Sequence, residues 1–135
     1  MPNKTVFHVE LIKPSHYDDD GYVIQWYKAW IPSNSLASLF AQTTLAAADS
    51  VLGQDVEIVT NGYDETNTAV PVDKIIRRIR AAGGQGIVCM VGVQSNQFPR
   101  AMDMARRFRA AGIQVAIGGF HVSGCIAMLP EMPND

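Results

Sequence analysis

Apolar runs alternate with amphipathic stretches along the chain, in the order expected for alternating strands and helices. Residues 86–93 (GIVCMVGV) form an almost unbroken apolar run. Such a run is typical of a central strand in a parallel sheet that helices cover on both faces. Shorter runs rich in β-branched and apolar residues predict three further strands, over residues 6–12, 56–59 and 113–117.

Between these runs, apolar residues recur at intervals of three and four, which predicts helices. The helices are expected over residues 36–53, 71–83 and 99–111, each ending at a glycine-containing turn. The order β-α-β-α-β-α-β then predicts an α/β fold with a doubly wound parallel sheet and right-handed connections.

Two segments do not fit this alternation. Residues 15–32 combine an acidic turn with four aromatic side chains that follow it, over residues 22–30, which indicates a long functional loop in which Trp26 and Trp30 serve for packing. The tail from Cys125 begins like a further helix and stops at prolines without a fifth strand. We expect the sheet to be truncated after its fourth strand and the chain to continue beyond residue 135; an exposed sheet edge is the alternative.

Composition narrows the class of protein. The chain has 135 residues, of which 47% are hydrophobic, and this favours one domain over residues 1–135. A net charge of -2 argues against nucleic acid as a partner. No apolar run approaches the roughly 20 residues of a membrane span and no signal peptide is visible, so we expect a cytoplasmic protein without a membrane partner. Cys89 and Cys125 are interpreted as small buried hydrophobes.

Ligands of open α/β sheets bind beyond the carboxyl ends of the strands, where the strand order reverses. The segments expected there are residues 14–22, 60–65, 94–99 and 118–124. Gly118 and Gly119 would let the backbone approach a bulky ligand, and Ser123 adds a hydroxyl. Residues 94–97 (QSNQ) add neutral hydrogen-bonding groups, so together these segments predict a groove for an uncharged polar surface. A simple turn is the alternative reading of the two glycines.

Several common sites of this architecture are missing. The first strand is followed by KPSH, which is neither a dinucleotide fingerprint nor a phosphate-binding turn, and VGVQ after the third strand lacks a phosphoacceptor aspartate. His16 with residues 18–20 could hold a metal, but a solvated acidic turn is the favoured interpretation. His8 is interpreted as a hydrogen-bonded sheet histidine, and His121 as either a turn residue or a ligand contact.

Four strings, LIKPSHYDDDGYVIQW, IPSNSLASL, VGVQSNQFPRA and AIGGFHVSG, resemble the amino-terminal domain of cobalamin-binding radical S-adenosylmethionine proteins. The resemblance covers essentially the whole chain. It implies a flavodoxin-like cobalamin fold, in which the corrin lies across the carboxyl edge of the sheet and the nucleotide tail reaches between strands. The cofactor-binding residues that it implies are Ser95, Asn96, Gly118, Gly119, Ser123 and, more weakly, His121.

The chain departs from the family pattern in two places. The D-x-H-x-x-G string, which supplies a lower-axial histidine in many cobalamin proteins, is absent, and residues 16–21 (HYDDDG) have the wrong order. The C-x-x-x-C-x-x-C motif is also absent, so a four-iron four-sulfur cluster and S-adenosylmethionine would bind a downstream domain.

The resemblance implies a cobalamin-binding module that is not catalytic alone. It would position the corrin for its own downstream radical domain, for a reaction such as methyl transfer on an unidentified small molecule. The alternative is a docking domain without cofactor that uses the aromatic loop at residues 22–30. A free-standing hydrolase or transferase is disfavoured, because no nucleophile and base pair is evident in the sequence.

Overall fold

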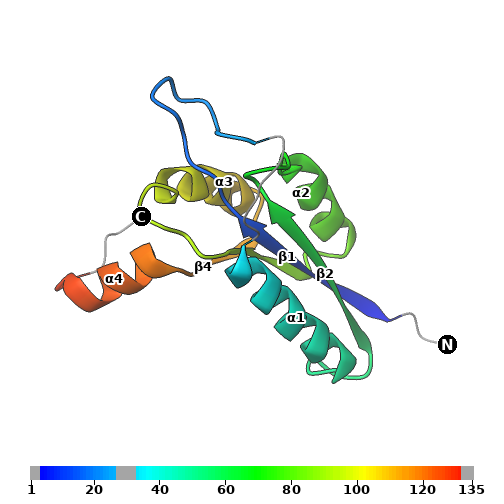
Figure 1. Ribbon diagram of the computed structural model, residues 1–135. Helices are drawn as coiled ribbons and strands as arrows, with labels where there is room; N and C mark the ends of the chain where they lie inside the picture. Colours follow the sequence, from blue (N-terminus) through cyan, green and yellow to red (C-terminus); the bar gives the residue numbers. More distant parts are fainter. Residues whose placement is uncertain (1–3, 27–32, 132–135) are drawn as a thin grey trace.

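A computed structural model describes residues 4–26 and 33–131 as four strands and four helices in strict alternation (Figure 1). The strands are β1 (Thr5–Lys13), β2 (Val56–Asp64), β3 (Gly86–Met90) and β4 (Gln114–Ile117). The helices are α1 (Asn34–Ala48), α2 (Val72–Ala81), α3 (Phe98–Ala110) and α4 (Phe120–Met128). Among the described residues, no helix is both long and apolar enough to cross a membrane.

The four strands form one sheet in the order β2-β1-β3-β4, and all three pairings are parallel. Helix α1 packs on β1 and β2, whereas α2 and α3 pack on the opposite face and against each other (Figure 1). This is a flavodoxin-like doubly wound α/β arrangement, as the sequence predicts. The central position expected for β3 is confirmed.

The hydrophobic core lies between the sheet and the helices α2 and α3. The apolar residues that recur at three- and four-residue intervals in the predicted helix over residues 99–111 form a buried stripe on α3: Ala101, Met104, Ala105 and Phe108. Ile75 and Ile79 of α2 and Met90 of β3 join them in one cluster. Burying a side chain of this size stabilises the fold by about 1.5–3 kcal/mol, so this face carries most of the stability.

The opposite face is only partly covered, which corrects the expectation that helices flank β3 on both sides. Helix α1 has no buried residue. It packs over β2 through Phe40, whose ring carbon is 3.3 Å from the position that a Cβ on Gly62 would take. Because α1 stays over β1 and β2, Cys89 of β3 is only partly buried and Ala116 of β4 is exposed. The interpretation of Cys89 as a buried hydrophobe is therefore wrong.

Strand β2 continues to Asp64, five residues beyond its predicted end. The apolar pattern stops earlier because most of the later residues are polar, and two of them, Asn61 and Asp64, lie opposite polar residues of β1. The Asn61 amide donates to Glu10 Oε1 at 3.3 Å, and Arg78 of α2 donates to the same oxygen at 2.7 Å. Strand β3, by contrast, ends three residues before its predicted end, and Gly92 follows it with a φ of 60°.

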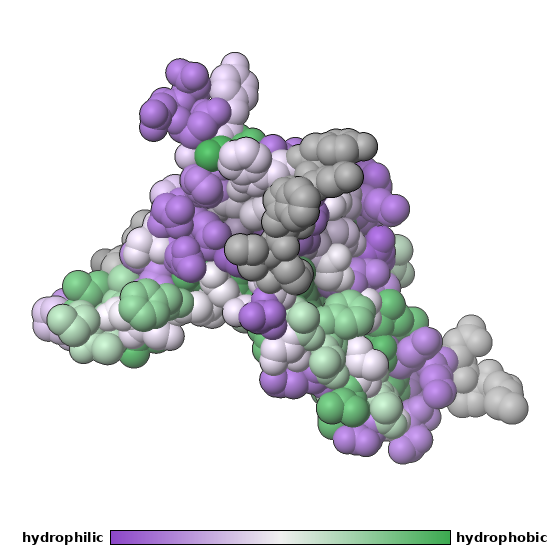
Figure 2. All heavy atoms as spheres, in the orientation of Figure 1, coloured by the Kyte–Doolittle hydropathy of each residue, from purple (hydrophilic) through white to green (hydrophobic). Residues whose placement is uncertain are grey.

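Helix α4 begins at Phe120, although the sequence analysis expected a loop over residues 118–124. It projects from the rest of the molecule in Figure 1, and none of its residues is buried. Phe120 is 83% exposed and Met128 is 81% exposed. In Figure 2, hydrophobic residues, drawn in green, are gathered on this helix. Cys125 lies on it and is only partly buried, so the buried interpretation is wrong for this cysteine as well.

The described part of the long loop, residues 14–26, turns at an acidic tip. The Asp18 carboxylate accepts hydrogen bonds from the backbone N–H groups of Asp20 and Tyr22, both at 2.9 Å. This confirms the solvated acidic turn. Trp26 is 63% exposed and does not pack into the core, while the predictions for Tyr27 and Trp30 lie outside the described residues.

The expectation for His8 is wrong. Its Nδ1 atom is buried and has no hydrogen-bond partner in the part of the chain that the structure describes. The pairing of the strands explains this, because His8 lies between Val59 of β2 and Gly86 of β3, and neither has a polar side chain.

Candidate functional site

An open groove of about 650 Å³ lies beside the carboxyl ends of β3 and β4, on the face of the sheet that carries α1. Ser35 and Ser38 of α1 form one wall. Cys89 and Ala116 line the sheet side, and Gly118 lies at the end of β4. The volume falls in the range of about 300–1,000 Å³ that is usual for small-molecule and cofactor sites.

The topology of the sheet explains why a groove forms here. Strand β1 lies between β2 and β3, so the connections leave β1 and β3 toward opposite faces of the sheet. Helix α1 therefore covers β2 and β1 and leaves the neighbouring part of the sheet open. The groove reaches the carboxyl ends of β3 and β4, next to the switch point between β1 and β3 at which ligands of doubly wound sheets bind.

The two glycines of the predicted site have different roles. A Cβ on Gly118 would meet no heavy atom within 4 Å, so this residue borders open space. A Cβ on Gly119 would lie 2.2 Å from the backbone nitrogen of Val93, and the φ of Gly119 is 131°. Gly119 is thus required for the close approach of two backbone turns, and Gly118 is free to face a ligand.

The other predicted site residues do not line the groove. His121 lies in the first turn of α4, and its Nδ1 atom is 3.0 Å from Ser95 Oγ, so the structure brings these two side chains together. Ser123 is exposed on α4, where its backbone N–H donates to Gly119 O at 3.1 Å. Asn96 is exposed in the turn before α3. Neither of these two joins a shared site with the glycines.

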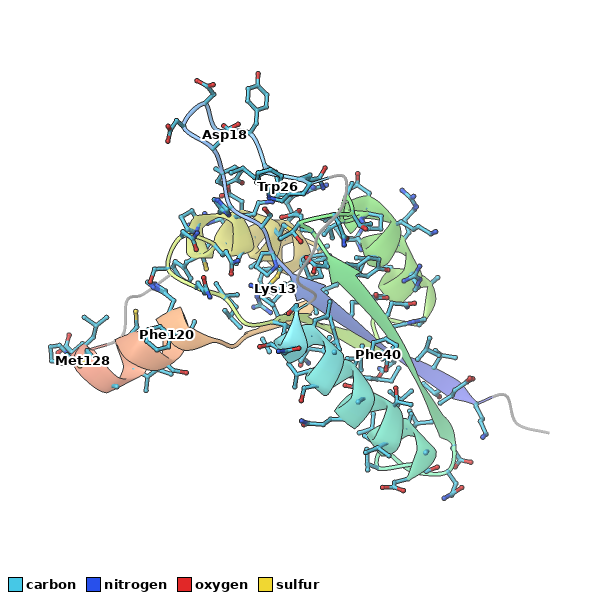
Figure 3. All side chains as sticks on the ribbon, in the orientation of Figure 1. Lys13, Asp18, Trp26, Phe40, Phe120 and Met128 are labelled. Atoms are coloured by element: carbon cyan, nitrogen blue, oxygen red, sulfur yellow. The ribbon has the colours of Figure 1, made fainter. Side chains whose placement is uncertain are left out.

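Lys13 lies where β1 and β3 diverge (Figure 3). From the sequence it was interpreted only as the residue at the end of a strand. Its ammonium group donates to Gly92 O at 2.9 Å and to Gln97 Oε1 at 2.6 Å. Burial lowers the pKa of Lys13, and the nearby carboxylate of Asp64 opposes this effect in part. Lys13 thereby holds the turn after β3 against the end of β1.

A second polar cluster fixes the loop after β1. Arg100 of α3 pairs with the buried Glu65, donating from Nε to Oε1 at 3.0 Å and from its second terminal nitrogen to Oε2 at 2.8 Å. The hydrogen bonds to Glu65 raise the pKa of Arg100, although burial lowers it. The Arg100 guanidinium also lies over the Tyr17 ring, 5.7 Å from its centroid. This cluster therefore anchors residues of the long loop to α3.

The sequence analysis missed the wall that α1 contributes. Residues 33–35 precede the predicted helix, and Ser33 caps it, since its Oγ accepts from Leu36 N at 3.2 Å. Asn34 and Ser35, the next two residues, line the groove. The sequence does hint at this wall. A helix cap uses one polar side chain, here that of Ser33, so Asn34 and Ser35 remain available to contact a ligand.

The groove offers binding rather than reaction chemistry. Hydroxyl groups of α1 stand opposite an apolar sheet surface, and no charged side chain among the described residues lines the groove. The first turn of α1 has no acidic residue, so its free N–H groups favour an anionic group of a ligand. Among the described residues, no three His, Cys, Asp or Glu side chains gather to hold a metal, which leaves the His16 hypothesis without support.

Comparisons of the chain with protein-family models, with curated proteins and with solved structures found no significant match.

Proposed function

We propose that this chain is the cobalamin-binding module of a radical S-adenosylmethionine enzyme. In this proposal the nucleotide tail of the corrinoid lies in the groove beside Gly118, and the corrin ring lies across the carboxyl edge of the sheet. The observation that carries the proposal is an open groove at this edge, bordered by a glycine at which a Cβ would meet nothing within 4 Å. A cytoplasmic location, as expected from the sequence, belongs to the same proposal.

The groove fits a nucleotide tail in both shape and polarity. A benzimidazole base is flat and apolar, which suits the sheet surface at Cys89 and Ala116. The ribose presents hydroxyl groups, for which Ser35 and Ser38 are matching donors and acceptors. The tail phosphate carries one negative charge, and the first turn of α1 favours it. The sequence contains no axial histidine motif, so we assign no lower ligand.

The residues of this chain would bind and orient the cofactor, and the cofactor would supply the organometallic chemistry. A tail held in the groove would leave the opposite face of the corrin open to the downstream domain. That domain would hold S-adenosylmethionine and a four-iron four-sulfur cluster. Such a cluster needs three thiolates, whereas this sequence has two cysteines, Cys89 and Cys125.

Exposed apolar side chains favour a second function, that of a docking domain without cofactor. They lie on α1 and α4: Leu39, Phe40, Leu45, Phe120, Ile126 and Met128. Figure 2 shows apolar atoms gathered over both helices. Exposed apolar surface of this kind often marks a protein interface. A module that presents a cofactor to another domain also needs such an interface, so this surface is compatible with both functions.

A titration with hydroxocobalamin, followed by gel filtration, distinguishes the two functions. We expect the red corrinoid to co-elute with the wild-type chain at about one per chain. Gly118→Leu should abolish co-elution, because Gly118 lines the groove and a Cβ there would meet no protein atom within 4 Å. Gly124→Leu is the matched control, since a Cβ at Gly124 also meets nothing within 4 Å and Gly124 does not line the groove. Equal retention by wild type and Gly118→Leu would refute the proposed site, and no retention by either would favour the docking domain.

A further inference from the structure

A thiol, an imidazole and a hydroxyl form a small cluster between α4 and the start of α3, and none of the three lines the groove. His121 Nε2 is 3.6 Å from Cys125 Sγ, and His121 Nδ1 is 3.0 Å from Ser95 Oγ. The imidazole ring also packs against Phe98, with ring centroids 4.4 Å apart. His121 and Cys125 are four residues apart on one helix, and this spacing places them on the same face.

The helix is anchored so that this arrangement is held. The backbone N–H of His121 donates to Val93 O at 3.2 Å, which ties the first turn of α4 to the turn after β3. Ser95 and Phe98 follow that turn and hold the imidazole ring from two sides. The ring therefore presents Nε2 to the Cys125 sulfur.

Both protonation states of the pair have hydrogen-bond partners. With the thiol protonated, Nδ1–H of His121 donates to Ser95 Oγ and Nε2 accepts from the Cys125 S–H group. After proton transfer, both ring N–H groups still have acceptors, namely the Ser95 oxygen and the thiolate. A neighbouring base that takes the thiol proton is the usual way in which a cysteine becomes a nucleophile.

No other charged group lies in the segments that form the cluster. Helix α4 contains no Asp, Glu, Lys or Arg, and residues 91–99 contain none. The next charged residue along α3 is Arg100, which is engaged by Glu65. Lys13 reaches the turn after β3 but donates to Gly92 and Gln97. His121 is therefore the only titratable side chain paired with Cys125 in the described structure.

We propose that Cys125 is a covalent modification site for small disulfides, with His121 as the base and Ser95 as the positioning residue of its imidazole. His121 Nε2 takes the Cys125 proton while Sγ attacks one sulfur of the disulfide. The S–S bond of the small molecule breaks, a mixed disulfide forms at Cys125, and the other half leaves as a thiolate. The proton passes from His121 to water, so no further oxidant or reductant is needed.

The aromatic disulfide dithionitrobenzoate tests this proposal, because its leaving thiolate is coloured. Cys89→Ser leaves Cys125 as the single thiol, and Cys125→Ser leaves Cys89 as the internal control. At a pH of about 7 we expect Cys125 to react about tenfold faster than Cys89. His121→Gln in the Cys89→Ser background should slow Cys125 about tenfold, and Ser95→Ala should slow it by a smaller factor.

A second pH separates activation of the thiol from simple access to it. At a pH of about 10 ordinary thiols are ionised, so a base is no longer needed and the effect of His121→Gln should vanish. A rate that His121→Gln leaves unchanged at the lower pH, or slows equally at both, would overturn the proposal. Thermal unfolding of each variant shows whether it is folded. If His121→Gln does not fold, the labelling rates of Ser95→Ala at the two pH values provide the comparison instead.

Discussion

Arg100 and Glu65 form a two-point ion pair that joins α3 to the segment after β2. Glu65 is buried, with 2% of its side chain exposed, and its Oε1 atom also accepts from the backbone N–H of Ser15 at 3.2 Å. One carboxylate thus connects α3 with the loop that follows β1. The carboxyl edge of the sheet is organised around this contact and the contacts of Lys13.

Arg100→Ala should lower the free energy of unfolding by about 3 kcal/mol, because it leaves the Glu65 carboxylate buried without its cation. Urea denaturation measures the change. Arg106→Ala is the control, since Arg106 pairs with Asp103 at 3.3 Å and both side chains are at least half exposed. We expect an effect within about 0.5 kcal/mol for the control. Equal losses in the two variants would contradict the role given to Glu65.

The glycines at the end of β4 should respond differently to the same substitution. Gly119→Ala should destabilise the protein by more than about 3 kcal/mol, since the new Cβ would lie 2.2 Å from Val93 N. Gly118→Ala should change stability by no more than about 0.5 kcal/mol, because the space around it is open. Thermal and urea unfolding of the two variants provides the comparison. A tolerated Gly119→Ala would mean that the two turns do not approach as described.

Lys13 should contribute to the pH dependence of stability. Burial lowers its pKa in the folded state below the ordinary value of 10.5. At a pH between the folded and unfolded pKa values of Lys13, the ammonium group is protonated more fully in the unfolded chain than in the folded one. The free energy of unfolding therefore rises with pH in that window. We therefore expect the stability of wild type relative to Lys13→Met to increase from a pH of about 8 to about 10. A relative stability that is flat or falls over this interval would contradict the lowered pKa.

The sequence predicts the fold well because the central elements are regular. Strand β3 and the apolar stripe of α3 both face one continuous core. The spacing of their apolar residues therefore predicts both the type of element and the side that is buried. A helical start is predicted only from Cys125, and the first turn of α4 escaped prediction for the opposite reason. The helix buries no residue, and apolar side chains lie all around it, so no amphipathic pattern marks where it begins.

The candidate site could be predicted only in part. Two glycines after a strand indicate a close approach, but the sequence does not say whether a ligand or another turn is the neighbour. For Gly119 the neighbour is Val93, and that contact depends on two loops 26 residues apart in the chain. The pairing of His121 with Cys125 was hidden in the same way, because their spacing has meaning only once α4 is known to begin at Phe120.

Protection of Cys89 tests the central claim most directly. Cys89 lines the groove, and burial raises its pKa, so in the Cys125→Ser variant a maleimide should label it slowly at a pH of about 8. Hydroxocobalamin at saturating concentration should slow this labelling about tenfold, whereas cobinamide, which lacks the nucleotide tail, should not. The predicted result is protection by the complete corrinoid alone. Labelling that is unchanged by hydroxocobalamin, or slowed equally by cobinamide, would contradict a tail bound in this groove.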